Sequence, residues 1–374
     1  MARLIFAVLL LLLSLLAVFK APAFYLWYLA IMVTEFPLIF LSITSIVLFW
    51  GIKVQRHQWE GTIACIIAFI LFVSPIIRAA TVAKNLSGNL QQAFDSSIAH
   101  DKAGFNAFKA VAQIGEKEIA YNTVTYSNVV NPGLTMDIYP SQLPGIRPCV
   151  IVVHGGSWAG GDSRQLPELN SVLAKKGYHV ASINYRLAPA YKSPAPVVDV
   201  AAAISYLSHN AERLFIDTHK FILLGRSAGA QIVLEAAYRN PPSGVKGVVS
   251  FYGPADMIWG YLHPANPLIM NSCQVMEDFI GGTYQQLPAA YSACSPIEAA
   301  GATALPTLLI HGKNDPLVAY EHSTRLVNKL KTTGVKYYLL TLPWATHGCD
   351  YTLNGPSGQL TTYAIEQFLM YCCR

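Results

Sequence analysis

Charged side chains are scarce in this chain of 374 residues. Asp, Glu, Lys and Arg make up only 13% of the sequence, against about 25% in an ordinary soluble domain, and hydrophobic residues make up 53%. The net charge is a weak +5, and no basic run is longer than two residues. A nucleic-acid-binding groove needs clustered Lys and Arg, so the sequence predicts no nucleic-acid partner.

The chain also lacks the patterns that hold metals and cofactors. Its seven cysteines and ten histidines show no spacing typical of a zinc or iron–sulfur site. No phosphate-cradling glycine loop and no dinucleotide fingerprint occur. We therefore expect no metal and no cofactor. Cys273 and Cys294 are either disulfide partners or unpaired core residues, because spacing alone does not decide connectivity.

What the N-terminus has instead is long hydrophobic runs. Between Leu4 and Ile52 the only charges are Lys20 and Glu35. The apolar runs cover residues 4–19, 21–34, 36–52 and 61–77. A helix that crosses a bilayer needs roughly 17–25 apolar residues, so these runs predict an integral, multi-pass membrane protein. We expect residues 1–84 to form an anchor of about three transmembrane helices; a cleavable signal peptide over the first run is the alternative.

The basic residues of the anchor predict its orientation. Arg3 begins the chain, and Lys53 and Arg56 form the most basic loop between the runs. Positively charged loops tend to stay in the cytoplasm, so Arg3 and the loop with Lys53 and Arg56 should lie on the same side of the membrane. The chain between them must then cross the membrane an even number of times. Residues 4–52 would then form two spans, and the run at 61–77 would deliver the rest of the chain to the extracytoplasmic side. Four crossings and a cytoplasmic domain are the alternative.

The remainder of the chain has the composition of a globular domain. Residues 85–118 are polar and predict a linker into a domain over 119–374. Short β-branched or aromatic runs alternate there with helical stretches such as 197–209 and 321–331. This alternation predicts an α/β fold with a mostly parallel, doubly wound sheet, whose ligands bind beyond the carboxyl ends of the strands. Residues 254–304 predict a small cap over the site.

One short segment of this domain predicts a catalytic nucleophile. In "FILLGRSAGAQIV" (221–233) an apolar strand ends at Gly225, and Ser227 stands between Gly225 and Gly229 before an Ala- and Leu-rich helix. A serine at the tip of such a tight strand–helix turn is exposed in a strained backbone conformation, and its neighbours must be small.

A serine hydroxyl becomes nucleophilic only beside a base that an acid orients. "HGKNDPLV" places Asp315 after a strand, and "WATHGCD" places His347 after the last strand. The chain order Ser, Asp, His is the one expected with such an elbow, so these residues predict a Ser227–Asp315–His347 triad. Asp256, which also follows a strand, is the alternative acid, and Asp199 is expected to be structural.

The negative charge that develops on a substrate carbonyl needs preorganised N–H donors. "VVHGGSWAGGD" supplies two glycines directly after a buried strand. The candidate oxyanion-hole amides are those of Gly156 and Ser157, or of Gly155 and Gly156, together with that of Ala228. Trp158 either lines the acyl pocket or packs beneath this loop.

Taken together, "MDIYP", "HGGSW", "NYRLAP", "FIDTHKFILLGRSAGA", "SPIEA", "LIHGKND" and "THG" cover most of the domain. The chain resembles the α/β-hydrolases of the hormone-sensitive-lipase and carboxylesterase type, which include bacterial esterases and prenylcysteine methylesterases. The resemblance implies the same triad and an oxyanion loop at the HGG segment. Ser157 replaces the third glycine of that motif, which points to the HGGxW branch, and Arg226 precedes the nucleophile where an acid or Gln is frequent.

The predicted function is a membrane-anchored serine hydrolase that cleaves carboxylic esters through an acyl-enzyme. The expected substrate is a small or medium acyl ester, or a lipid-like ester such as a prenylcysteine methyl ester. An amidase of the formamidase kind or a peptidase would use the same triad. A non-catalytic hydrolase-like binding protein and a transporter with an accessory domain are the remaining alternatives.

Overall fold

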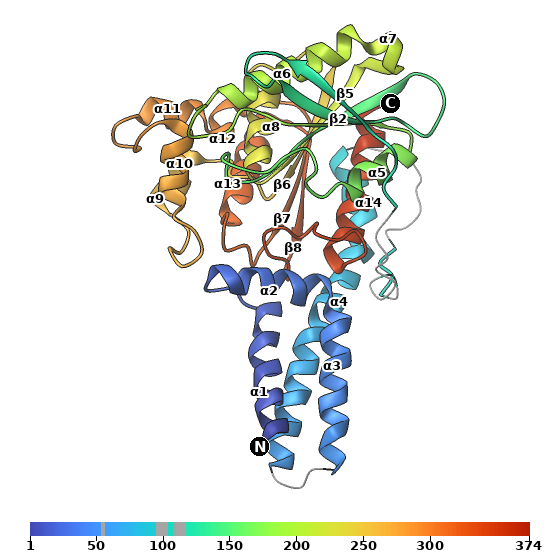
Figure 1. Cartoon of the computed structure of the whole chain (residues 1–374), viewed down its shortest axis with the longest axis vertical. Helices are drawn as coiled ribbons and strands as arrows, with labels where there is room; N and C mark the ends of the chain where they lie inside the picture. The colour runs from blue at the N-terminus through green and yellow to red at the C-terminus, as the bar shows by residue number, and fades with distance from the viewer. Residues whose placement is uncertain (54–56, 95–103, 108, 110–116) are drawn as a thin grey trace.

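The computed structural model describes residues 1–53, 57–94, 104–107, 109 and 117–374. Apolar helices project from one end of a body in which helices cover both faces of a sheet (Figure 1). Much of the linker expected at 85–118 lies outside the described residues.

The body is built on one eight-stranded sheet in the order β1-β2-β4-β3-β5-β6-β7-β8. The strands are β1 (Asn122–Ser127), β2 (Leu134–Tyr139), β3 (Arg147–Val153), β4 (His179–Ile183), β5 (Ile216–Arg226), β6 (Val245–Phe251), β7 (Thr307–Gly312) and β8 (Tyr337–Leu342). Among the strands of the described residues, the pairs β1–β2 and β2–β4 are antiparallel and the other neighbouring pairs are parallel. The expected α/β fold with a mostly parallel sheet is confirmed. The strand β1 was not predicted, because "NTVTYS" is largely polar and lies at the sheet edge.

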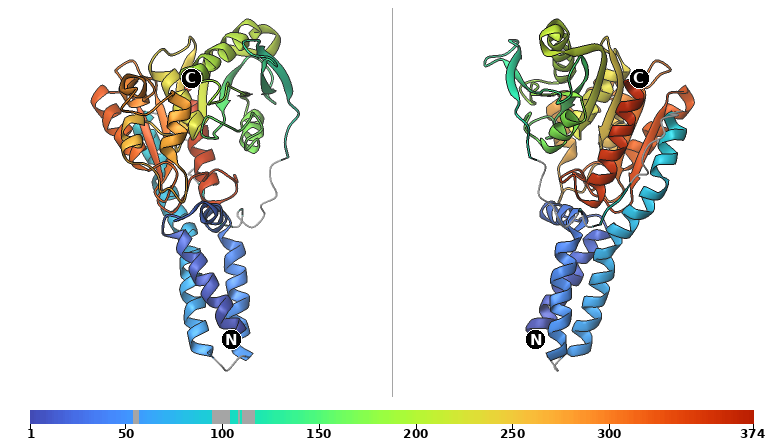
Figure 2. Two further views of the ribbon diagram at one scale, coloured as in Figure 1. Left: turned by 60° about the vertical axis from the view of Figure 1, so that its left-hand side comes forward. Right: turned by 90° about the vertical axis from the view of Figure 1, so that its right-hand side faces the viewer.

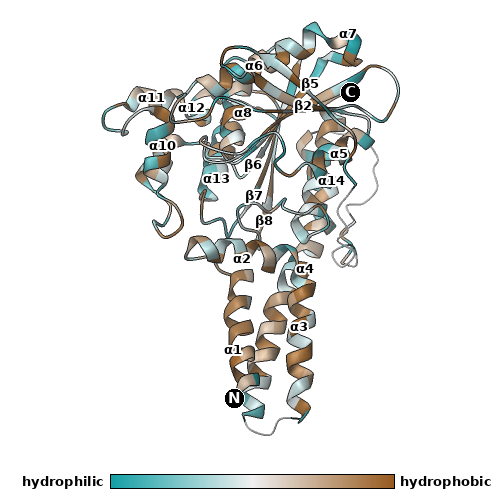
Figure 3. Cartoon of the chain, in the orientation of Figure 1, coloured by the Kyte–Doolittle hydropathy of each residue, from teal (hydrophilic) through white to brown (hydrophobic). Residues whose placement is uncertain are grey.

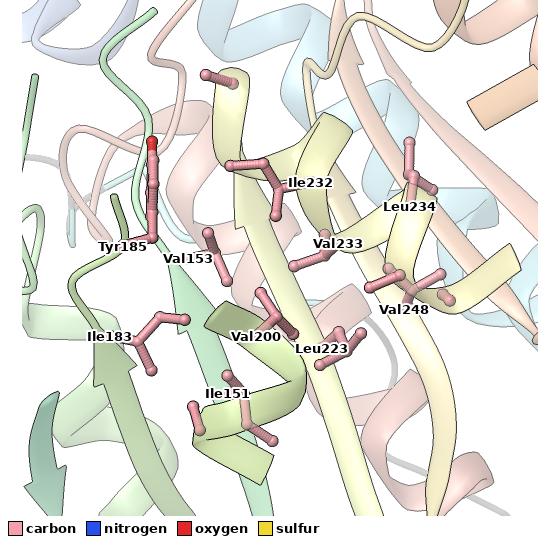
Figure 4. Packing of buried hydrophobic residues seen from close by; sticks show 14 of the residues in the cluster. Ile151, Val153, Ile183, Tyr185, Val200, Leu223, Ile232, Val233, Leu234 and Val248 are labelled. Atoms are coloured by element: carbon pink, nitrogen blue, oxygen red, sulfur yellow. The ribbon is translucent and has the colours of Figure 1, made fainter. Parts of the chain in front are cut away.

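Alternate residues of the central strands pack on opposite faces, as the pleat requires. Ile151, Val153 and Leu223 pack with α6 (Ala195–His209), α8 (Ala228–Tyr238) and α13 (Glu321–Thr333), and Figure 4 shows part of this cluster. Val150, Val152 and Leu224 pack with α5 (Glu168–Lys175) and α14 (Pro356–Cys372). Because both faces are covered, these strands are continuous apolar runs rather than alternating ones.

The N-terminal helices are α1 (Ala2–Ser14), α2 (Phe24–Glu35), α3 (Pro37–Trp50) and α4 (Gln58–Phe94). The first, third and fourth form a bundle, and α2 lies across its end, between the bundle and the body (Figures 1 and 2). The axes of α2 and α3 differ by 87°. In the part of the chain that the structure describes, α4 alone is long and apolar enough to cross a membrane, and α2 with α3 is a second candidate if the bent pair is one span.

The helix α4 belongs to both parts of the molecule. It continues through residue 84, where we expected the anchor to end. Its C-terminal half buries Ala79, Ala83, Leu86, Leu90 and Phe94 in the same core as α5 and α14. A helix of 37 residues is about 55 Å long, which is enough to extend from the bundle along the body.

The segment between β6 and β7 forms four short helices at one side of the body (Figure 1). They are α9 (Met257–Leu262), α10 (Ser272–Ile280), α11 (Pro288–Ala293) and α12 (Pro296–Ala299). Both cysteines of this segment are free thiols: that of Cys273 contacts the Tyr261 carbonyl, and that of Cys294 contacts the Ser193 hydroxyl. Of the two possibilities, the structure therefore has the unpaired one.

Candidate active site

The turn between β5 and α8 holds Ser227 in a strained conformation. Its φ of 52° and ψ of −118° lie outside the ordinary regions for an L-residue, and its amide donates to the Phe251 carbonyl. A Cβ on Gly225 would lie 2.3 Å from the carbonyl oxygen of Gly229, and one on Gly229 would lie 2.2 Å from that of Val153. Both positions therefore require glycine, a stricter condition than the small residues predicted from the sequence.

The structure brings the three predicted residues into hydrogen-bond contact. His347 Nε2 lies 3.0 Å from Ser227 Oγ, and His347 Nδ1 lies 2.7 Å from Asp315 Oδ2. Asp315 follows β7 and His347 follows β8, so both sit at the carboxyl edge of the sheet, where β5 also ends. If Nδ1 carries the proton and donates it to Asp315, Nε2 is free to accept the serine proton.

Asp315 is buried, and both of its carboxylate oxygens face donors. The amides of Leu317 and Val318 donate to Oδ1, each at 2.9 Å, and His311 Nε2 donates to Oδ2 at 3.2 Å. Burial acts to raise the pKa of Asp315, but attraction to His347 and the hydrogen bonds from both histidines outweigh it, so the pKa lies well below its usual value. The carboxylate is thus charged at neutral pH.

Sequence reasoning missed His311, which fixes this carboxylate. Its Nδ1 lies 2.7 Å from the Ser323 hydroxyl on α13, so the imidazole is held from both sides. The available signal was its place in the "HGKND" segment, four residues before Asp315. The two other aspartates considered from the sequence make no contact with His347. Asp256, the alternative acid, accepts from the Trp259 amide and pairs with Arg325. Asp199, which we expected to be structural, pairs with Arg186 of the "NYRLAP" segment.

The loop after β3 presents backbone amides near Ser227. Gly156 and Ser157 have φ values of 117° and 55°, which turn the chain sharply. In the residues that the structure describes, no acceptor is found for the amides of Gly156, Ser157 or Ala228. The Gly155 amide instead donates to Gln165 Oε1 at 2.7 Å. Of the two predicted pairs, the geometry therefore favours Gly156 with Ser157 over Gly155 with Gly156.

Arg226 points away from the pocket and into the body. Its side chain is buried, and Nε donates to Asp350 Oδ2 at 2.5 Å. Asp350 Oδ1 accepts from the Tyr252 hydroxyl at 2.6 Å, and the Tyr252 ring lies 4.3 Å from that of His347. Asp350 thus neutralises Arg226, the residue that departs from the family pattern. Through Asp350, Arg226 also helps to hold the Tyr252 ring that packs against His347.

A cavity of about 370 Å³ opens above Ser227. It is lined by Ser157, Trp158 and Ala228, and by Met270 and Met276 from the segment of α9 to α12. Trp158 also stacks on Phe279 of α10 at 4.5 Å, so it both lines the cavity and packs against the neighbouring helix. Residues 20–22, which lead into α2, line the cavity as well, and nothing in the sequence indicated this.

Comparison with known proteins agrees with this architecture. The BD-FAE family profile matches residues 136–330, just over half of the chain, and contains the β5–α8 elbow. The chain belongs to the BD-FAE family. In this BD-FAE protein the match ends within α13, so it contains Ser227 and Asp315 but not His347.

Relatives of this BD-FAE protein include esterases. The "Probable carboxylic ester hydrolase LipM" of Mycobacterium tuberculosis is 23% identical over 92% of this chain and 85% of its own length. The "Isoprenylcysteine alpha-carbonyl methylesterase ICME" of Arabidopsis thaliana is 24% identical over 60% of this chain, which spans only 56% of that relative. The solved structure titled "Bacterial Heroin Esterase" has a TM-score of 0.60 at 20% identity, over 71% of this chain and 89% of that one. The α/β-hydrolase resemblance inferred from the motifs is confirmed.

Proposed function

We propose that the protein is a serine hydrolase of carboxylic esters. The observation that carries this proposal is the chain of hydrogen bonds from Ser227 through His347 to Asp315 at the carboxyl edge of the sheet. The names of the relatives support the ester as substrate class, since LipM, ICME and the heroin esterase are all named for ester hydrolysis. The apolar cavity lining, with Trp158, Met270 and Met276, suits an acyl or alkyl group.

The reaction follows from the geometry. Ser227 Oγ attacks the ester carbonyl carbon while His347 Nε2 takes the hydroxyl proton, and the Asp315 carboxylate stabilises the resulting imidazolium. The carbonyl oxygen becomes an oxyanion that the amides of Gly156, Ser157 and Ala228 stabilise. Collapse breaks the ester C–O bond, and the alcohol leaves with the proton from His347. Water then attacks the acyl-enzyme by the same steps and releases the carboxylic acid and free Ser227.

We further propose that the bundle of α1, α3 and α4 anchors the enzyme in a membrane. Its outer surface exposes large apolar side chains, and only 33% of the most apolar window of α4 is buried, unlike a soluble core helix. Figure 3 shows that these three helices are mostly hydrophobic along their length. The exposed set includes Ile5, Phe6, Leu9, Leu12, Ile39, Ile43, Ile46, Phe49, Ile63, Ile66, Ile67 and Ile70. Exposed Trp50 and Trp59 lie at the far end of the bundle, as in the aromatic belt of a membrane protein.

In this proposed arrangement the run at 21–34 does not cross, since α2 lies across the bundle end. The three proposed spans are α4, which is long enough by itself, and the shorter apolar helices α1 and α3, of 13 and 14 residues. Arg3 and the short helix Gly51–Lys53 lie at the same end, opposite to the body, which fits two crossings between them. The positive end would be cytoplasmic and the hydrolase extracytoplasmic. A reporter active only outside the cytoplasm, fused after Arg374, should then be active; activity of a cytoplasm-only reporter would contradict this orientation.

Esterase activity is tested with the full chain in detergent. Wild type should hydrolyse 4-nitrophenyl butyrate, and Ser227→Ala should lose this activity while keeping the circular dichroism spectrum and melting temperature of the folded protein. The matched butyryl 4-nitroanilide tests the amide alternative. Retention of turnover by Ser227→Ala, or faster cleavage of the anilide than of the ester, would overturn the proposal.

A further inference from the structure

The helix α2 is attached to the catalytic machinery rather than only to the bundle. Trp27 Nε1 donates to the His347 carbonyl oxygen at 2.9 Å, and the two rings lie 6.1 Å apart. The Phe24 amide donates to the Leu268 carbonyl at 3.0 Å, in the segment of α9 to α12. These contacts join residues more than 240 positions apart, so the position of α2 and that of the catalytic loops are set together.

The residues before α2 form part of the cavity itself. Lys20, Ala21 and Pro22 line it together with Ser227. Asn266 Nδ2 donates to the Pro22 carbonyl at 3.2 Å, and Asn314 Nδ2 donates to the Val18 carbonyl at 3.1 Å. The lining of the cavity is therefore built partly from the segment that follows α1, at the level where the bundle meets the body.

The outer surface of α2 carries aromatic side chains that contact little of the body. Tyr25 is 81% exposed and Tyr28 is 51% exposed, and Phe24 packs edge-on against Tyr28 at 5.2 Å. This aromatic surface adjoins the apolar bundle, whose other end carries Trp50 and Trp59. Tyr and Trp favour the headgroup level of a bilayer, because their rings are apolar and their polar tips remain hydrated.

From these three observations we propose that α2 lies in the membrane surface and that the cavity opens there, so that the substrate is the ester of a membrane-resident amphiphile. The ester group reaches Ser227, and the long apolar chain remains beside α2 in the bilayer. A cavity of about 370 Å³ is at the small end of ligand pockets, so such a chain has to extend through the mouth. This inference rests on the proposed esterase function and on the proposed anchor.

The test compares two esters with the full chain reconstituted in phosphatidylcholine vesicles. The long-chain probe is 4-nitrophenyl palmitate in the vesicles, and the water-soluble probe is 4-nitrophenyl butyrate. In the variant Tyr25→Ser/Tyr28→Ser we expect kcat/KM for the palmitate to fall about tenfold or more, since interfacial rings hold α2 at the bilayer surface. We expect kcat/KM for the butyrate to stay within about twofold, since neither tyrosine lines the cavity.

Phe215→Ser is the matched control, because Phe215 is 61% exposed and follows α7 (Ala211–Leu214) at the far end of the body. It should change neither rate. Equal losses on both esters, or no loss on the palmitate, would overturn the inference. Wild-type hydrolysis of butyrate but not of palmitate would refute this inference alone, whereas hydrolysis of neither ester would refute the proposed function.

Discussion

Replacing Asp315 by its amide tests the role of this carboxylate without changing its volume. Oδ1 accepts two backbone amides and Oδ2 accepts from His347 and His311. The two backbone donors cannot turn away, so in Asp315→Asn the remaining side-chain oxygen must face them and the new NH₂ group must face His347. That NH₂ is a donor, which favours the His347 tautomer with the proton on Nε2. Such an imidazole cannot accept the proton of Ser227.

The same exchange in the catalytic triad of a serine protease lowers kcat about 10⁴-fold, which corresponds to about 5.4 kcal/mol of activation free energy. We expect Asp315→Asn to lower kcat for 4-nitrophenyl butyrate by a factor of this order, with little change in KM. The control is Asp256→Asn, which alters another buried carboxylate, one that pairs with Arg325, and should cost only a few-fold. Retention of more than about a tenth of kcat by Asp315→Asn, or a larger loss in Asp256→Asn, would refute the reasoning.

Two further predictions concern stability. Gly229→Ala places a Cβ 2.2 Å from the Val153 carbonyl and should destabilise the fold by about 2–4 kcal/mol, whereas Gly301→Ala, with nothing within 4 Å, should be nearly neutral in thermal unfolding. Burial, with a smaller contribution from the charge of His311, lowers the pKa of His322 to about 3, below the unfolded value of about 6.5. As the pH falls, His322 is therefore protonated in the unfolded chain before it is protonated in the folded one. The contribution of this neutral, buried imidazole to the free energy of unfolding is complete above pH 6.5 and is lost as the pH falls towards 3. His322→Asn keeps an acceptor for the Asp256 amide, and its free energy of unfolding should fall less than that of wild type between pH 7 and pH 5. An equal fall in wild type and variant would argue against the lowered pKa of His322.

The sequence predicted those features that are encoded locally. The glycines around Ser227 reveal the elbow because only a residue without a Cβ fits there, and the apolar runs reveal the central strands because both faces of a parallel sheet are covered. The chain order of Asp315 and His347 then follows from the strands that precede them. These two residues could be named without coordinates because the carboxyl ends of parallel strands meet at one edge.

Features that depend on contacts between distant segments were not predictable in this way. The run at 21–34 looks like a membrane span by composition, and only its contacts with Leu268 and His347 show that it lies across the bundle. The second half of α4 reads as polar linker sequence, yet its buried residues recur at the spacing of a helix face that packs on the body. The Gly155 amide is an oxyanion-hole candidate by sequence, but it donates to Gln165 Oε1, ten residues away, and nothing in the sequence indicates that contact.

The most direct test of the central claim, that Ser227 is the nucleophile of a serine ester hydrolase, is covalent labelling of the full chain with a fluorophosphonate. Such a reagent forms a stable phosphonyl ester with a serine hydroxyl that a neighbouring base activates. We predict one adduct per chain, located by mass spectrometry on the peptide that contains Ser227, and no labelling of Ser227→Ala. An adduct on another residue, or equal labelling of Ser227→Ala, would contradict it.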